Sequence, residues 1–259
     1  MHNRQQTRII AMCGKGGVGK TSISAAAVRI LIRNPDSRVL AIDADPAVGL
    51  AGALGIRVEK TVDDIRNALI QRVLEGKSED KPEMLSRLDY EMFSALVEKD
   101  NLVFLAIGRP EKEGCYCQVN HILKDIIKSI AGNFDYVVID GEAGVEQVNR
   151  RVMEKVSHLI LVSDASAKGL NVAGTIREVS DTAIEYKQVG LILNRLKTEQ
   201  ERDKLSIPGD LNCLGWVPED DTIRNFDMEG KSILQAPECP AINAVEKCIA
   251  RMGLGETVR

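Results

Sequence analysis

One octapeptide near the start of the chain constrains the fold more than any other feature. The segment Gly14-Lys15-Gly16-Gly17-Val18-Gly19-Lys20-Thr21 fits the pattern G-x-x-x-x-G-K-[ST] and lies between an apolar run and an amphipathic run. Its glycines let the backbone wrap a phosphate chain with the N–H groups pointing inward. The helix that follows adds the positive end of its dipole. We therefore predict a strand, a phosphate-binding loop and a helix, with Lys20 reaching the β- and γ-phosphates and Thr21 ligating Mg²⁺.

Short apolar runs alternate with longer amphipathic runs along the rest of the chain. This alternation is typical of βαβ units and a mostly parallel sheet. No linker rich in Pro, Gly or Ser divides the sequence, so we predict one doubly wound α/β domain of the P-loop NTPase type over residues 1–259, with seven or eight strands. The predicted strands are Arg8–Cys13, Arg38–Asp43, Leu102–Ile107, Tyr136–Asp140, Leu159–Ser163, Val189–Asn194 and Leu211–Val217. The predicted helices are Lys20–Arg33, Val62–Leu74, Pro82–Val97 and Asn120–Ala131, with a loop at Gly76–Asp80.

The composition excludes several classes of partner and location. The chain of 259 residues carries 38 acidic and 34 basic side chains, a formal net charge of −4 at pH 7, and so lacks the basic excess that nucleic acid binding needs. No apolar run approaches the roughly 18 residues of a membrane span, and the first residues lack the apolar core of a secretory signal. Six cysteines without framework spacing are typical of a reducing compartment. We expect a cytoplasmic protein with neither nucleic acid nor membrane as partner.

Lys15 is an unusual residue for a phosphate-binding loop, because glycines surround it and Lys20 already serves that site. The segment CGKGGVGKTS resembles the deviant Walker A loop of the superfamily of nitrogenase iron proteins, MinD and ParA. The resemblance implies that Lys15 crosses the interface of a homodimer and contacts the partner's nucleotide, as an arginine finger does. The alternative is an ordinary solvated lysine.

Two further motifs resemble the switches of the same superfamily. IDADPAVGL places Asp43 and Asp45 at the end of a predicted strand, where two carboxylates can approach Mg²⁺ and the attacking water. The resemblance implies that Asp45 orients this water and that Asp43 acts nearer the metal; for either residue the alternative is a helix cap. YVVIDGEAGVEQ resembles the second switch, which implies a contact of Asp140 near Mg²⁺ and of Gly144 near the γ-phosphate. Glu142 is assigned no role.

Two shorter motifs near the end of the chain bear on the base. By the resemblance, ILNR places Asn194 at the amide edge of adenine and WVPED places Pro218 and Glu219 near the base, which favours ATP and ADP. The expected catalytic residues are Lys15, Lys20, Asp43, Asp45 and Asp140. The expected nucleotide contacts are Gly14, Gly16, Gly17, Val18, Gly19, Lys20, Thr21, Ser22, Gly144, Asn194, Arg195, Pro218 and Glu219.

A pair of cysteines, Cys115 and Cys117, follows the predicted strand Leu102–Ile107. Two thiolates one residue apart can hold a soft ion but supply only half of a four-sulfur site. A two-fold axis would bring two copies together and complete the four sulfurs. We therefore expect one Ni²⁺ or Zn²⁺ per homodimer, bound by both cysteines of each chain. The alternative is two ordinary thiols, and the role of His121 is left open.

Together these motifs most resemble the CooC-type ATPases, which mature nickel carbon monoxide dehydrogenase and, in related forms, acetyl-CoA synthase. The resemblance implies an ATP-hydrolysing metallochaperone with one of these enzymes as client. Two alternatives remain. One is a reductase with a bridging iron–sulfur cluster, although Asp140–Arg151 lacks the cysteine that nitrogenase-type iron proteins have there. The other is a MinD- or ParA-like positioning switch, although the apolar stripe Ile242, Val245 and Ile249 favours a packed terminal helix over a membrane-seeking one.

Overall fold

An eight-stranded sheet runs through the part of the chain that the computed structural model describes. These residues are 6–75, 80–109, 117–142, 144–145, 148–149, 152–209 and 211–255. The strand order is β3-β4-β2-β5-β1-β6-β7-β8. Every neighbouring pair is parallel except β3 and β4, which form an antiparallel edge. The strands are β1 (Arg8–Cys13), β2 (Val39–Asp43), β3 (Val97–Lys99), β4 (Leu102–Ala106), β5 (Tyr136–Asp140), β6 (His158–Ser163), β7 (Gln188–Leu196) and β8 (Cys213–Pro218).

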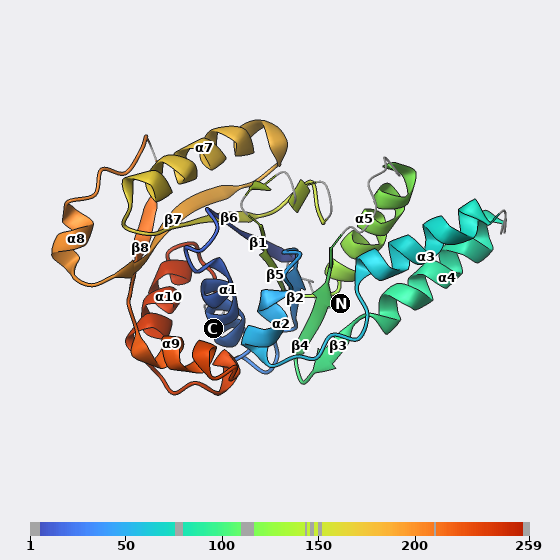
Figure 1. Cartoon of the computed structure of the whole chain (residues 1–259), viewed down its shortest axis with the longest axis horizontal. Coiled ribbons are helices and arrows are strands. Elements are labelled where there is room, and N and C mark those ends of the chain that lie inside the picture. The colour runs from blue at the N-terminus through green and yellow to red at the C-terminus, as the bar shows by residue number, and fades with distance from the viewer. Residues whose placement is uncertain are drawn as a thin grey trace.

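Helices cover both faces of this sheet and bury a separate apolar core on each (Figure 1). The first core lies under α3 (Val62–Leu74), α4 (Lys81–Ser94), α5 (Cys117–Ala131) and α7 (Ala167–Ala183). The second lies under α1 (Lys20–Leu31), α2 (Gly49–Leu54), α9 (Asp221–Met228), the short 3-10 helix η1 (Ile233–Gln235) and α10 (Pro240–Ala250). The five-residue helix α8 (Glu199–Asp203) follows β7 and has no buried residue.

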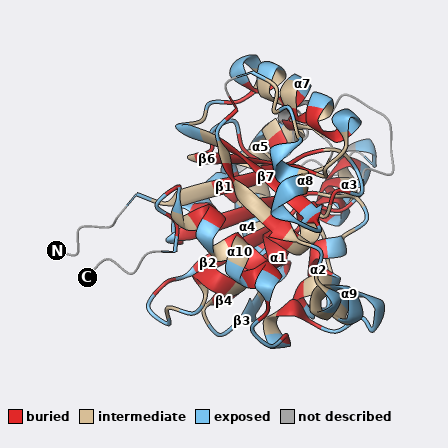
Figure 2. Ribbon diagram, turned by 90° about the vertical axis from the view of Figure 1, so that its left-hand side faces the viewer, coloured by how far each residue is buried: buried red, intermediate tan, exposed pale blue. Residues whose placement is uncertain are grey.

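The central strands are apolar on both faces because each face is covered by helices. All five residues of β2, β4 and β5 are buried, as Figure 2 shows for the middle of the molecule. Their sequences VLAID, LVFLA and YVVID are therefore near-continuous apolar runs instead of alternating ones, as expected for parallel strands. Two of these runs end in an aspartate, so the charged groups of these strands lie at their carboxyl ends.

The seven strands predicted from the sequence are all present, five of them with ends shifted by one or two residues, and two of the predicted helices differ more. The prediction of a helix over Pro82–Val97 is too long, because α4 ends at Ser94 and the chain turns into β3 at Val97. A three-residue edge strand with one apolar residue gives no periodic pattern. Helix α5 begins at Cys117, three residues earlier than predicted. Most of the predicted loop Gly76–Asp80 lies outside the described residues.

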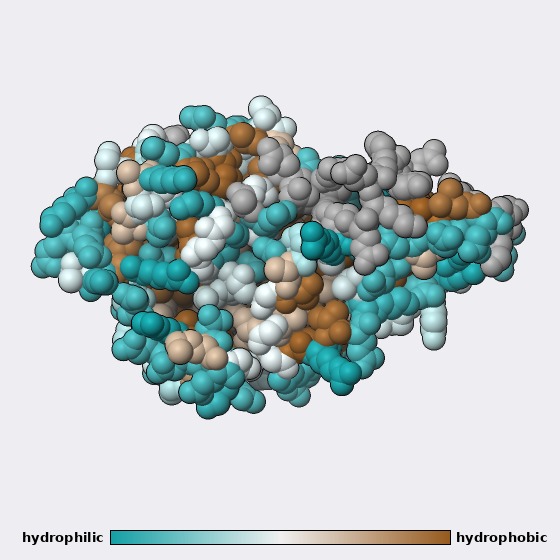
Figure 3. Space-filling view, viewed as in Figure 1, coloured by the Kyte–Doolittle hydropathy of each residue, from teal (hydrophilic) through white to brown (hydrophobic). Residues whose placement is uncertain are grey.

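The helix α10 packs against the second apolar core. Ile242, Val245 and Ile249 of α10 are buried, which confirms the prediction of a packed helix. On the face shown in Figure 3 the surface over α8 is hydrophilic. In the described residues, no helix has both the length and the apolar character that a membrane crossing requires.

Candidate nucleotide-binding site

The phosphate-binding loop follows β1, a central strand, at the carboxyl edge of the sheet. In doubly wound sheets ligands bind at this edge. The loop passes so close to its neighbours that two positions have no room for a side chain. A Cβ atom at Gly14 would lie 2.2 Å from the carbonyl oxygen of Val162, and one at Gly19 would lie 2.3 Å from Nδ2 of Asn194. Gly19 also has a φ of 91°, in the left-handed region that glycine adopts freely.

The two polar side chains that close the loop face a cavity of about 500 Å³. Lys20 is 7% exposed, and its Nζ donates to the carbonyl oxygen of Lys15 at 3.2 Å. Thr21 donates from Oγ1 to Oδ2 of Asp140 at 2.7 Å. Gly16, Gly17, Gly19 and Ser22 line the same cavity, so most of the predicted loop contacts surround one space.

Asp140 ends β5 and is almost fully buried behind this cavity. Ser24 of α1 donates to its second oxygen, Oδ1, at 2.8 Å. Burial raises the pKa of Asp140, while the hydrogen bonds from Thr21 and Ser24 and the charge of Lys20 oppose that rise. The carboxylate therefore fixes the hydroxyl of Thr21 from behind, as the sequence prediction of a contact near Mg²⁺ requires.

Asp43 and Asp45 have different surroundings, although the sequence predicts that both face the metal and the attacking water. Asp43 is fully buried, and its carboxylate accepts hydrogen bonds from the backbone N–H groups of Leu50 at 2.8 Å, of Asp45 at 3.1 Å and of Ala51 at 3.4 Å. Asp43 thus accepts hydrogen bonds from free N–H groups in the first turn of α2. This is the helix-cap role given above as the alternative. Burial and the charge of Asp140 raise the pKa of Asp43 to about 7.

Asp45 instead lines the phosphate cavity. Its Oδ1 accepts a hydrogen bond from the N–H of Ala47 at 2.9 Å, which holds the turn after β2. Lys15 is half-buried at the opposite end of the loop. Among the described residues its ammonium group makes no hydrogen bond or ion pair. The role of Lys15 across a dimer interface stays a prediction.

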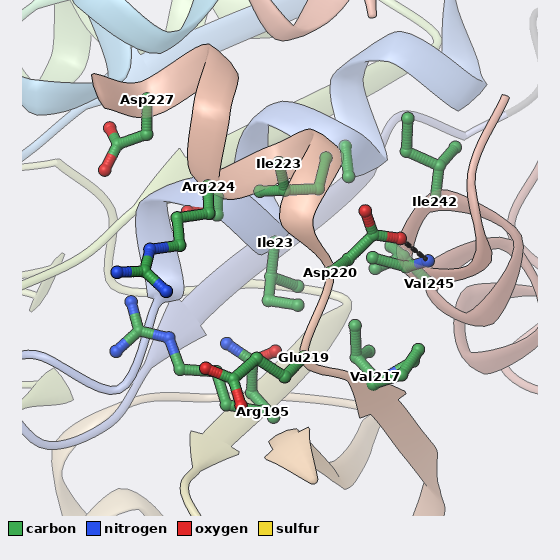
Figure 4. Close-up of a pocket in the computed structure, with 15 residues that line it drawn as sticks. Ile23, Arg195, Val217, Glu219, Asp220, Ile223, Arg224, Asp227, Ile242 and Val245 are labelled. Atoms are coloured by element: carbon green, nitrogen blue, oxygen red, sulfur yellow. Dashed lines mark hydrogen bonds between the residues drawn. The ribbon is translucent and has the colours of Figure 1, made fainter. Parts of the chain in front are cut away.

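A second cavity of about 290 Å³ opens beside the first and is drawn in Figure 4. Asn194, Pro218 and Glu219, the three residues predicted to lie near the base, line it together with Arg195. Asn194 is 5% exposed and donates from Nδ2 to the carbonyl oxygen of Val18 at 2.8 Å. This bond ties the end of β7 to the phosphate loop.

The walls of this cavity also include residues that the sequence did not indicate. Apolar side chains from α1, β8, α9 and α10 form most of it, and Arg224 and Asp227 of α9 add charges. The two cavities share Ser22, Arg195 and Asp227. A purine base in the second cavity and a phosphate chain in the first would therefore be continuous. The segment WVPED, just before α9, was the sequence signal nearest to this wall of the cavity.

The remaining predicted residues are less defined. Gly144 and Glu142 are half-buried after β5. Cys115 and the side chain of Cys117 lie outside the described residues, so the predicted metal ligands are not placed. His121 is exposed on α5, with Nε2 3.6 Å from Oδ2 of Asp125. The described residues contain no group of three or more potential metal ligands.

A family model described as an AAA domain matches residues 7–188. The chain belongs to this family. An uncharacterized ATP-binding protein of Methanocaldococcus jannaschii is 37% identical over 236 residues, which cover 89% of this chain and 92% of that protein. The carbon monoxide dehydrogenase accessory protein CooC of Rhodospirillum rubrum is 28% identical over 241 residues, 89% of this chain and 91% of that protein.

The fold of this AAA-domain chain is also found in solved structures. The MinD cell division protein of Aquifex aeolicus superimposes with a TM-score of 0.67 and 22% identity, covering 98% of this chain and 99% of that one. The predicted doubly wound P-loop fold is thereby confirmed. This likeness to the MinD cell division protein concerns the fold.

Proposed function

We propose that the protein is a homodimerising ATPase that couples ATP binding and hydrolysis to the delivery of a soft metal ion. The proposed ion is nickel, and the proposed recipient is carbon monoxide dehydrogenase or acetyl-CoA synthase. One observation carries the metal role: a C-x-C pair whose second cysteine, Cys117, begins α5. Similarity to the CooC accessory protein supports the same role.

The nucleotide part of the proposal rests on the arrangement of the two cavities. Lys20 reaches the β- and γ-phosphates, and Thr21, oriented by Asp140, ligates Mg²⁺. Mg²⁺ held there would neutralise developing charge on the phosphates. Asp45 lies at the cavity wall and positions the attacking water, while Lys15 of the partner copy stabilises the transition state. Asp43 supports this site by holding the turn that carries Asp45.

The metal part of the proposal adds one ion per dimer, held by Cys115 and Cys117 from both chains. Four thiolates are a donor set that suits Ni²⁺ or Zn²⁺. The phosphate loop follows β1, and the C-x-C pair follows β4 in the sequence. Closure of the dimer around ATP would then change the distance between the two cysteine pairs.

A second candidate function is a nucleotide-driven positioning switch, which the fold shared with the MinD cell division protein favours. Such a switch needs an anionic surface to bind. The chain carries a net charge of −4, and the apolar face of its last helix is buried in the core, so neither feature favours a lipid or DNA partner.

The test is metal analysis of the protein purified without oxygen, with and without ATP. We expect nickel or zinc bound at one ion per two chains and no absorption from an iron–sulfur cluster. Iron and sulfide in equal amounts with a brown colour would support the reductase alternative. Absence of any bound or acquired metal, together with ATP-dependent pelleting on vesicles or DNA, would replace the proposal by the positioning switch.

A further inference from the structure

Two arginines meet where the base cavity opens onto the phosphate cavity. Ser22, Arg195 and Asp227 line both cavities, so this junction is where the segment that joins base and phosphates would pass. Arg224 lines the base cavity from α9. Figure 4 shows its guanidinium group pointing toward that of Arg195.

Neither guanidinium group is neutralised by the described part of the chain. Arg195 donates from Nη1 to the carbonyl oxygen of Gly17 at 3.0 Å, and that acceptor carries no charge. Arg224 has no side-chain hydrogen bond or ion pair among the described residues. Glu219 and Asp227 line the same cavity but pair with neither arginine.

The backbone holds Arg195 in this place at a conformational cost. Its φ is 60°, which is uncommon for a residue with a side chain. The register of β7 against β8 shifts between Asn194 and Leu196, so Arg195 is the extra residue of a local irregularity. Irregularities of this kind re-aim a side chain and occur beside functional sites. Here the irregularity directs a cation back over the phosphate loop.

Two cations that face each other repel unless an anion lies between them. Guanidinium groups bind phosphate oxygens in a two-pronged geometry that suits such a bridging position. Lys20 and Thr21 occupy the β- and γ-phosphate end, and Ser22, the next residue along α1, lies at the junction. The phosphate that reaches the junction is therefore the α-phosphate.

We propose that Arg224 binds the α-phosphate of the nucleotide together with Arg195 and so selects nucleotides over nucleosides. This assignment rests on the proposed nucleotide site and adds a residue to it. The alternative role for an arginine at a base cavity is stacking on the face of adenine.

The experiment measures the affinity of adenosine, AMP, ADP and ATP by competition against a fluorescent ADP analogue. Arg224→Gln should weaken AMP, ADP and ATP by the same factor, about 10- to 150-fold, the range of one charge-assisted hydrogen bond. Adenosine should bind as before. Arg224→Lys should fall between, because it keeps the charge without the fork. Asn225→Ala, at an exposed neighbour on α9 that does not line the cavity, is the matched control.

Three results would overturn the assignment. An equal loss for adenosine would show that Arg224 stacks on the base. Unchanged affinities in Arg224→Gln would show that it touches no nucleotide. An equal effect of Asn225→Ala would show that α9 acts as a whole. If the unaltered protein binds none of the four compounds, the proposed function itself fails, and this result is separate from any difference between variants.

Discussion

Alanine substitutions at two glycines of the phosphate loop should differ sharply in their effect on stability. Gly17 and Gly19 have φ values of 84° and 91°. An alanine at either position adopts a left-handed conformation at a cost of about 1–2 kcal/mol. The surroundings differ, because a Cβ atom at Gly17 meets nothing within 4 Å, whereas one at Gly19 lies 2.3 Å from Nδ2 of Asn194.

The additional cost at Gly19 has two sources. Asn194 has to move, which forces about 1–3 kcal/mol of overpacking into a buried site. The move also breaks its hydrogen bond to the carbonyl oxygen of Val18, and this loss adds about 1 kcal/mol. We therefore expect Gly17→Ala to lower the free energy of unfolding by about 1–2 kcal/mol and Gly19→Ala by about 3–6 kcal/mol.

Urea unfolding without nucleotide or Mg²⁺ measures this difference directly, because ligand binding would otherwise add to the apparent stability. The double variant Gly19→Ala with Asn194→Ala should recover part of the loss, since the smaller side chain makes room for the methyl group. Equal midpoints for Gly17→Ala and Gly19→Ala would refute the argument that close packing of Asn194 requires the glycine.

Three further predictions concern charged residues of the site. Lys20→Ala should abolish ATP binding measured by calorimetry. Lys15→Ala should still bind ATP but lose most phosphate release. If Lys15→Ala hydrolyses ATP at the rate of the unaltered protein, Lys15 does not act in the partner's site. Asp45→Ala should bind ATP, stall before hydrolysis and accumulate a dimer on size-exclusion chromatography, and free turnover would contradict its role in positioning water. Asp43 has a pKa raised to about 7 in the folded protein from 3.8, so the unaltered protein should lose stability relative to Asp43→Asn as pH rises from about 4 to about 7. The difference between the two pKa values corresponds to at most about 4 kcal/mol of unfolding free energy. Urea unfolding midpoints of both proteins, measured at pH 4.5 and pH 8, should therefore differ by unequal amounts at the two pH values. The same difference at both pH values would rule out a buried proton on Asp43.

Most of the fold is predictable because the sheet is parallel and covered on both faces. Strands such as Tyr136–Asp140 are then unbroken apolar runs, which stand out from the amphipathic helices between them. The antiparallel edge β3 is missed because its three residues are largely exposed and carry no apolar pattern. An edge strand of this kind is fixed by its pairing with β4 and not by its own sequence.

The site is predictable where a local motif dictates backbone geometry and less so where distant segments meet. The loop around Lys20 and Thr21 follows from glycine spacing, and the structure places both at one cavity. The distinct roles of Asp43 and Asp45 depend on how the turn folds back onto α2, which spacing alone does not reveal. Arg224 was not found because its proposed role depends on α9 and the end of β7 lining one cavity.

The most direct test of the central claim is a titration of Ni²⁺ or Zn²⁺ into the protein with ATP, followed by light scattering and metal analysis. The account predicts saturation at one ion per two chains with a shift to the mass of a dimer, and weaker binding as pH falls because the thiolates take up protons. Cys117→Ala should lose both the ion and metal-dependent dimerisation, while Cys213→Ala should lose neither. A tight site with one ion per chain, or one that survives Cys117→Ala, would contradict a metal bridge between subunits.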